Sequence, residues 1–268
     1  VVARANQSWG MQGPSTWAEL EARLSGRSHQ GSAPVTPRPP EPDSRAMPRV
    51  RSRVPYAELH CHSNFSFLDG ASDPDELVAE ADRLDLTALA LTDRNGLYGV
   101  VRFAEAAREV GLPTVFGSEL VVQHTTGERQ LVVLADGPAG YTRLARAISL
   151  AQLNGSKNAP RCTIADLAEE GRGHWWVLTG THDGIVPRAL AEHGPSAAIR
   201  ELRDLVDAFG RDRVVVELWD QGDPLDSAPT DALAEMAARP DVHTSAATPV
   251  RSASPAARRL ASAPAAGR

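Results

Sequence analysis

The stretch of sequence that decides the fold spans residues 56–70 and reads Tyr56-Ala57-Glu58-Leu59-His60-Cys61-His62-Ser63-Asn64-Phe65-Ser66-Phe67-Leu68-Asp69-Gly70. Successive side chains of a β-strand point to opposite faces, so His60 and His62 share one face. Asp69 follows on a turn that ends in Gly70. Two imidazoles and a carboxylate at a strand end are ligands that suit Zn, Mn or Fe. Histidine pairs at this spacing also occur as ordinary surface residues, so the rest of the chain must decide between the two readings.

Length and composition point to a single domain. The chain has 268 residues, 42% of them hydrophobic, and its mean hydropathy is −0.28. These values fit one α/β domain with loosely structured ends. No apolar run approaches the roughly 18 residues of a membrane span, and the first residues lack the pattern of a secretory signal. We therefore expect a cytoplasmic protein with no membrane partner.

The charge of the chain argues against independent binding of duplex DNA. The formal net charge is −6, from 28 basic and 34 acidic residues. A domain that grips duplex DNA alone is usually basic, because neutralising phosphates dominates its affinity. Cys61 and Cys162 lie far apart in the sequence, and we expect no disulfide framework.

The chain divides into three segments. Residues 1–53 read as a leader and a linker rich in Pro, Ser and Arg, in which a capping box at 16–19 predicts one short helix. Residues 54–248 alternate between strand and helix patterns and form the main domain. Residues 249–268, rich in Ala, Ser, Pro and Arg, predict a mostly unstructured tail and a truncation point.

Within the main domain, hydrophobic periodicity and capping signals predict alternating strands and helices. The first strand starts at residue 56, and others are expected near 87–92, 114–122, 130–135, 175–179, 213–219 and 242–246. Helices are expected near 73–84, 97–110, 141–153, 163–170, 186–193, 196–209 and 230–239. Repeated βα units imply a parallel sheet with helices outside, and a barrel is its closed form.

Polar residues gather at or just beyond the ends of these strands. In such barrels, ligands and catalytic groups lie at the carboxyl ends of the strands. Any one carboxylate taken alone is better explained by capping a turn, but the position shared by several strand ends makes a common site an equal reading. The residues concerned are His60, His62, Asp69, Asp93, Glu119 and Glu217.

Five runs of sequence resemble the PHP (polymerase and histidinol phosphatase) domain. They are YAELHCHS at 56–63, SFLDGAS at 66–72, ALALTD at 88–93, GLYGVVRFAEAA at 96–107 and TVFGSEL at 114–120. Within that family, the runs resemble the amino-terminal PHP domain of bacterial C-family DNA polymerases, above all the error-prone DNA polymerase III alpha-type subunits of actinobacteria. Those subunits act in damage-induced translesion synthesis. The resemblance implies a distorted (βα)7 barrel, of the α/β class, with a mostly unstructured N-terminal extension and C-terminal tail.

The resemblance also implies a set of site residues. Metal-competent PHP domains carry a trinuclear site at the barrel mouth, where bridging metals activate water for phosphoester hydrolysis. The ligand positions of this site correspond to His60, His62, Asp69 and Glu119. Asp93 and Glu217, from their place at strand ends, and His182, from its place beside Thr181, are kept as accessory candidates.

Four positions depart from the family ligands. Histidine is replaced by Arg94, Gln130 and Thr248, and a cysteine by Thr181, which His182 could compensate. A guanidinium is permanently charged and cannot ligate a metal, so Arg94 is expected to pair with Asp69 or Asp93. We therefore expect one divalent ion at most, Zn or Mn, and no full trinuclear site.

Three functions remain open on this basis. The favoured one is a structural PHP scaffold of an error-prone polymerase, whose polymerase palm lies outside this chain. Its partners would be the remainder of the polymerase, in the same chain or split from it, and, by resemblance, a sliding clamp or mutagenesis accessory proteins. DNA would be contacted only through the absent domains. The alternatives are a stand-alone metal-dependent phosphoesterase or exonuclease, and an unrelated α/β barrel with coincidental histidines.

Overall fold

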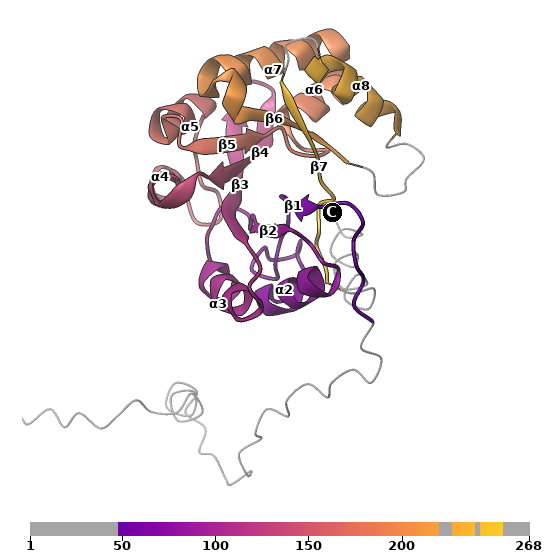
Figure 1. The fold of residues 1–268 in the computed structure, drawn as a ribbon. Helices are drawn as coiled ribbons and strands as arrows, with labels where there is room; N and C mark the ends of the chain where they lie inside the picture. The colour runs from indigo at the N-terminus through magenta and orange to yellow at the C-terminus, as the bar shows by residue number, and fades with distance from the viewer. Residues whose placement is uncertain (1–47, 220–226, 239–241, 254–268) are drawn as a thin grey trace, which may run out of the picture. The chain divides into compact units, whose positions relative to one another are not determined.

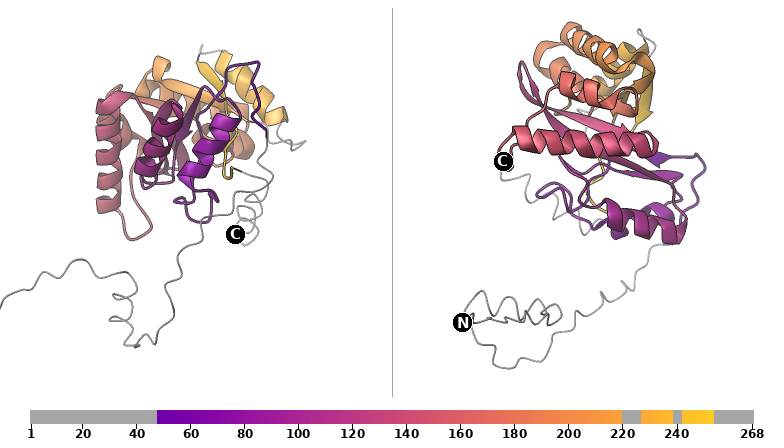
Figure 2. Two further views of the ribbon diagram at one scale, coloured as in Figure 1. Left: turned by 60° about the horizontal axis from the view of Figure 1, so that its bottom comes forward. Right: turned by 90° about the vertical axis from the view of Figure 1, so that its left-hand side faces the viewer.

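The computed structural model describes residues 48–219, 227–238 and 242–253 as a curled sheet with helices on its outside (Figures 1 and 2). The short helix predicted near residues 16–24 lies outside the described residues. The described sheet has seven strands: β1 (Ala57–Glu58), β2 (Ala88–Leu91), β3 (Thr114–His124), β4 (Gly127–Ala135), β5 (Trp175–Leu178), β6 (Val214–Leu218) and β7 (His243–Ala246).

Helices follow most of the strands. They are α2 (Pro74–Arg83), α3 (Val100–Val110), α4 (Gly137–Asn154), α5 (Ile164–Gly171), α6 (Ile185–His193), α7 (Pro195–Phe209) and α8 (Ser227–Ala238), with a 3-10 turn η1 (Arg211–Arg213) before β6. The expected fold class, a distorted seven-stranded α/β barrel, is confirmed. Of the helices described, none is both long enough and apolar enough to cross a membrane.

The sheet follows the order of the chain, β1-β2-β3-β4-β5-β6-β7. Strands β1 to β3 are parallel, as are β5 to β7, but β4 is antiparallel to both of its neighbours. The expectation of a parallel sheet is therefore wrong at β4. The chain passes from β3 to β4 through Thr125 and Thr126 alone, and so short a connection can only join antiparallel strands. Gly127, at φ 106°, supplies the backbone conformation that this turn needs.

The two edges of the sheet meet just beyond β1 and β7. Cys61 forms a parallel bridge with Val250. In this bridge, His62 N donates to Val250 O at 2.9 Å and Val250 N donates to His60 O at 3.1 Å. The histidine-bearing segment is thus held in place by the segment after the last strand.

Residues 247–253, which we call the closing strap, continue along that segment. Arg251 O accepts a hydrogen bond from Ala71 N at 2.8 Å, and Ala253 N donates to Ser72 Oγ at 2.9 Å. Residues 249–253, which belong to the predicted tail, are ordered because their backbone pairs with the loop after β1.

Apolar side chains fill the inside of the sheet as well as its outer face. The inner cluster takes Ala90 from β2, Val132 and Leu134 from β4, Leu178 from β5 and Val215 from β6. The barrel is therefore a packed core rather than a pore, as in other closed α/β sheets. Larger clusters lie between the sheet and its helices.

Local sequence sets most helix ends where they were predicted. Asp73 and Pro74 open α2, and the Glu76 side chain accepts from Asp73 N at 3.2 Å. Gly111, at φ 73°, ends α3 as expected. Helix α3 begins three residues later than predicted, and α4 begins four residues earlier, with Pro138 in its first turn.

We predict that Phe103→Ala lowers the free energy of unfolding by about 3–5 kcal/mol, because it leaves a cavity under α3. Phe103 is 0% exposed in the described structure and meets Phe116 edge to face. The control, Val101→Ala, lies on the same helix at 65% exposure and should change stability by less than about 0.5 kcal/mol. Urea denaturation measures both, and equal losses would contradict the packing described here.

Candidate metal centre

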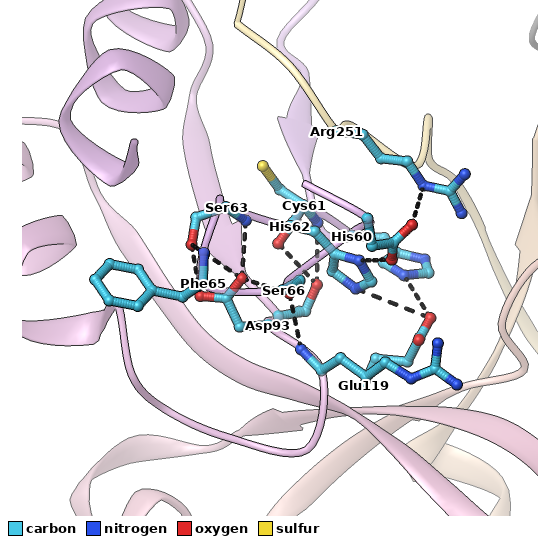
Figure 3. A network of polar contacts seen from close by, with 12 residues as sticks. His60, Cys61, His62, Ser63, Phe65, Ser66, Asp93, Glu119 and Arg251 are labelled. Carbon is cyan, nitrogen blue, oxygen red and sulfur yellow. Dashed lines mark hydrogen bonds and ion pairs between the residues drawn. The ribbon is translucent and has the colours of Figure 1, made fainter. Parts of the chain in front are cut away.

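Two buried histidines form the centre of the candidate site (Figure 3). His60 and His62 are 2% and 3% exposed, and their rings meet edge to face with centroids 5.3 Å apart. Both follow β1 and lie on one side of it, as the alternation of the strand predicts. The backbone carbonyl of His60 and the backbone N–H of His62 both hydrogen-bond to the backbone of Val250.

His60 lies between two carboxylates. Its Nδ1 is 2.7 Å from Glu217 Oε1, and its Nε2 is 3.3 Å from Glu119 Oε2. Burial by itself lowers the pKa of His60, but Glu217 and Glu119 outweigh burial and raise the pKa to about 10. In the absence of a metal, His60 is therefore an imidazolium that joins two strands of the barrel.

His62 is oriented by Asp69. Its Nδ1 donates to Asp69 Oδ2 at 2.7 Å, and its Nε2 lies 3.9 Å from Glu119 Oε2. Burial opposes ionisation of Asp69, but the hydrogen bond from His62 and nearby positive charges lower the pKa of Asp69 to about 2. Asp69 also forms an ion pair with Arg251, whose Nε lies 3.1 Å from Asp69 Oδ1.

Glu119 faces both imidazoles from β3. Its backbone is bridged to Arg94, and Asn95 N donates to Glu119 O at 2.8 Å. Burial by itself raises the pKa of Glu119, but the hydrogen bond from His60 and nearby positive charges, Arg94 among them, lower it below its ordinary value. Glu119 is therefore a carboxylate in the folded chain.

Three of these groups converge closely enough to hold one ion. Ligand atoms of His60, His62 and Glu119 all lie within 4.8 Å of one another. Within the described structure, His62 Nε2 and Glu119 Oε1 are buried and have no hydrogen-bond partner. Each such atom costs about 1–3 kcal/mol, and one divalent ion would satisfy both. Each imidazole binds a carboxylate through Nδ1 and directs Nε2 towards Glu119, the arrangement that orients histidine ligands of metals.

The residues fit one divalent ion, held by His60, His62 and Glu119, with Glu217 and Asp69 orienting the two imidazoles. Such an ion would polarise a phosphoryl oxygen or acidify a bound water. Binding it would require His60 to lose the proton that it shares with Glu119. Of the accessory residues predicted from strand ends, Glu217 therefore belongs to this cluster.

Asp93 is placed differently. It accepts hydrogen bonds from Ser63 N at 2.8 Å, Ser63 Oγ at 2.8 Å and Ser66 Oγ at 2.7 Å (Figure 3). It thus fixes the loop between His62 and Asp69. The predicted pairing of Arg94 with Asp69 or Asp93 is wrong, because Arg94 forms no ion pair with any described residue. Arg251 holds Asp69 instead.

The structure places the four positions that depart from the family ligands as follows. Arg94, which follows β2, and Gln130, which lies in β4, line one cleft of about 170 Å³. Thr181 is buried, and its carbonyl accepts from Gly184 N at 2.8 Å. Thr248 N donates to Glu58 Oε2 at 3.0 Å in the closing strap.

His182 is exposed and lies edge to face with the Trp219 ring at 5.0 Å. It is not among the described residues that converge as potential ligands, so its predicted accessory role gains no support from the geometry.

Sequence reasoning missed three contributors. Arg251 carried no signal, because it lies in a tail without periodicity and meets Asp69 only when the barrel closes. Ser63 and Ser66 bind Asp93 from within the quoted stretch. Serine is a common turn residue whose hydroxyl binds nearby groups, and this signal could have located them.

A family model for the PHP domain matches residues 58–221. The chain belongs to the PHP domain family. This PHP domain is 48% identical over 266 residues to the error-prone DNA polymerase of Mycolicibacterium paratuberculosis, covering 93% of this chain and 24% of that protein. It is 46% identical over 260 residues to the error-prone DNA polymerase of Cutibacterium acnes, covering 88% of this chain and 22% of that protein. The resemblance to actinobacterial error-prone polymerases is confirmed, and the chain spans about a quarter of their length.

Solved structures share the fold at low sequence identity. A putative metal-dependent phosphoesterase from Bifidobacterium adolescentis aligns with a TM-score of 0.56 at 16% identity, covering 75% of this chain and 90% of that one. An amidohydrolase from Chromobacterium violaceum, solved with sulfate and no metal, aligns with a TM-score of 0.54 at 18% identity, covering 73% of this chain and 87% of that one. At these identities the likeness establishes the fold alone.

We predict that the stability of the metal-free chain falls as pH rises from about 6.5 to about 10. The folded-state pKa of His60 is raised from 6.5 to about 10, so its contribution is complete below the lower value and lost on passing the upper one. Unfolding free energies across this range, together with NMR titration of the His60 ring, test the prediction. A His60 ring that loses its proton near pH 6.5 in the folded chain would contradict it.

Proposed function

We propose that this chain is the amino-terminal PHP module of an error-prone, damage-induced translesion DNA polymerase of the III alpha type. In this proposal it is a structural scaffold that holds at most one divalent ion. The identities to error-prone polymerases support the assignment, since they extend over most of this chain and about a quarter of each relative. As a polymerase module it would act in the cytoplasm.

The observation that carries the scaffold role is the ion pair between Arg251 and Asp69. Hydrolysis by the bridging-metal mechanism needs closely spaced ions and an open coordination position. Asp69 Oδ1 is paired with Arg251, and Asp69 Oδ2 is hydrogen-bonded to His62. Only His60, His62 and Glu119 then remain as a convergent set among the described residues.

DNA synthesis would belong to the rest of the polymerase. Nucleotidyl transfer needs its own carboxylates to hold two divalent ions on a palm domain. In this proposal the palm is supplied by a further part of the same chain or by a separate chain. DNA, a sliding clamp and mutagenesis accessory proteins would be contacted through the assembled polymerase.

We predict that the purified chain binds no more than about one Mn²⁺ or Zn²⁺. It should hydrolyse neither a phosphomonoester nor a single-stranded oligonucleotide, because the bridging-metal mechanism needs more than one closely spaced ion. Metal analysis and the two assays measure this. His62→Ala should abolish any binding, whereas the control His193→Ala, an exposed histidine of α6, should not. Metal-dependent turnover that His62→Ala removes would establish the phosphoesterase alternative instead.

In a polymerase that carries this module, Glu119→Gln should leave primer extension largely unchanged, because the scaffold does not use its site for chemistry. Phe103→Ala should reduce the yield of folded, active polymerase, because it weakens the scaffold itself. Primer-extension rates per folded molecule separate the two effects. A large loss of extension rate in Glu119→Gln with intact folding would contradict a purely structural role.

A further inference from the structure

Carboxylates are concentrated around the two histidines. Side chains of Asp69, Glu119 and Glu217 are 14%, 5% and 0% exposed, and all lie within ion-pair distance of His60 or His62. Buried carboxylates need positive charge close by, since an uncompensated charge in a protein interior is costly. Bound metal ions are one source of that charge.

Two arginines from separate segments of the chain supply positive charge near this site. Resting on the proposed scaffold role, we propose that Arg251 and Arg94 are built-in counter-cations, which balance the carboxylates of this site in place of divalent metal ions. Together they carry the charge of one divalent ion. Unlike an ion, they cannot dissociate, and a guanidinium keeps its charge at every physiological pH.

The closing strap fixes the position of Arg251. The neighbouring Val250 bridges Cys61, and the carbonyl of Arg251 accepts from Ala71 N at 2.8 Å. From this anchored backbone, Arg251 Nε reaches Asp69 Oδ1 at 3.1 Å. An exposed ion pair usually contributes little, and the Arg251 side chain is 48% exposed. Here, however, Asp69 is mostly buried and hydrogen-bonded to His62. The positive charge of Arg251 therefore stabilises a buried carboxylate rather than an exposed one.

The backbone of Arg94 is also anchored. Its backbone N donates to Ser66 Oγ at 3.0 Å, and its backbone is bridged to that of Glu119. It forms no ion pair with a described residue, yet its charge lowers the pKa of both Asp69 and Glu119. Arg94 therefore acts on the carboxylates through space.

The proposal has a consequence for metal binding. A divalent ion at His60, His62 and Glu119 would enter a site that already carries two fixed positive charges. Repulsion between like charges is weakly screened where water is excluded. Removal of either arginine charge should favour the ion, and the ion should then replace the stability that the arginine supplied.

The test uses Arg251→Gln, Arg94→Gln and the double variant, with Mn²⁺ as the only added ligand. Titration calorimetry should show Mn²⁺ binding tightened by roughly tenfold or more for each charge removed. Without metal, the variants should melt at a lower temperature than the wild type. Adding Mn²⁺ should raise the melting temperature of the double variant by more than it raises that of the wild type.

Two controls isolate the charge. Arg251→Lys keeps the positive charge and should bind Mn²⁺ as the wild type does. Arg102→Gln removes an arginine whose pairs with Asp73 and Asp75 lie on the surface, and it should leave Mn²⁺ binding unchanged. If the double variant is too unstable to purify, the single variants carry the same test.

Variants that melt lower but bind Mn²⁺ no more tightly, and are not restored by it, would overturn the proposal and leave Arg251 with an ordinary structural role. That result would leave the proposed scaffold function standing, because only metal-dependent hydrolysis by the wild type would contradict that function. Equal tightening in Arg102→Gln would also overturn it, because the effect would then be one of overall charge.

Discussion

The pairing of Cys61 with Val250 is the contact on which the rest of the site depends. It joins the first and last edges of the sheet and fixes the segment that carries both histidines. Once the barrel is closed there, His60 meets Glu217 from β6, and Asp69 meets Arg251 from the closing strap. None of these contacts is local in sequence, so a single long-range pairing determines the chemistry of the site.

Much of the fold was predictable because its signals are local. Alternation placed His60 and His62 on one face, and capping boxes and glycines set most helix ends. The antiparallel strand β4 was misjudged, although the short turn before it implied a hairpin. The pairing of Arg251 with Asp69 could not be predicted from the sequence, because closure of the barrel brings the two residues together and no sequence spacing indicates it. For the same reason, the predicted partner of Arg94 was wrong.

The site combines two features that point in opposite directions. His62 Nε2 and Glu119 Oε1 are buried without a described partner, which favours an ion between them. Arg251 and Arg94 place positive charge beside that position, which disfavours one. A site of this kind retains the geometry of a metal centre, while arginine side chains of the same chain balance the negative charge of its carboxylates. Such an arrangement fits the scaffold role proposed above.

Diffraction from crystals soaked in manganese, with anomalous scattering, tests this account most directly. The account predicts at most one manganese peak, between His60, His62 and Glu119, with the Arg251–Asp69 pair intact. Several manganese ions clustered at the barrel mouth, with Asp69 released from Arg251 to bind them, would contradict it.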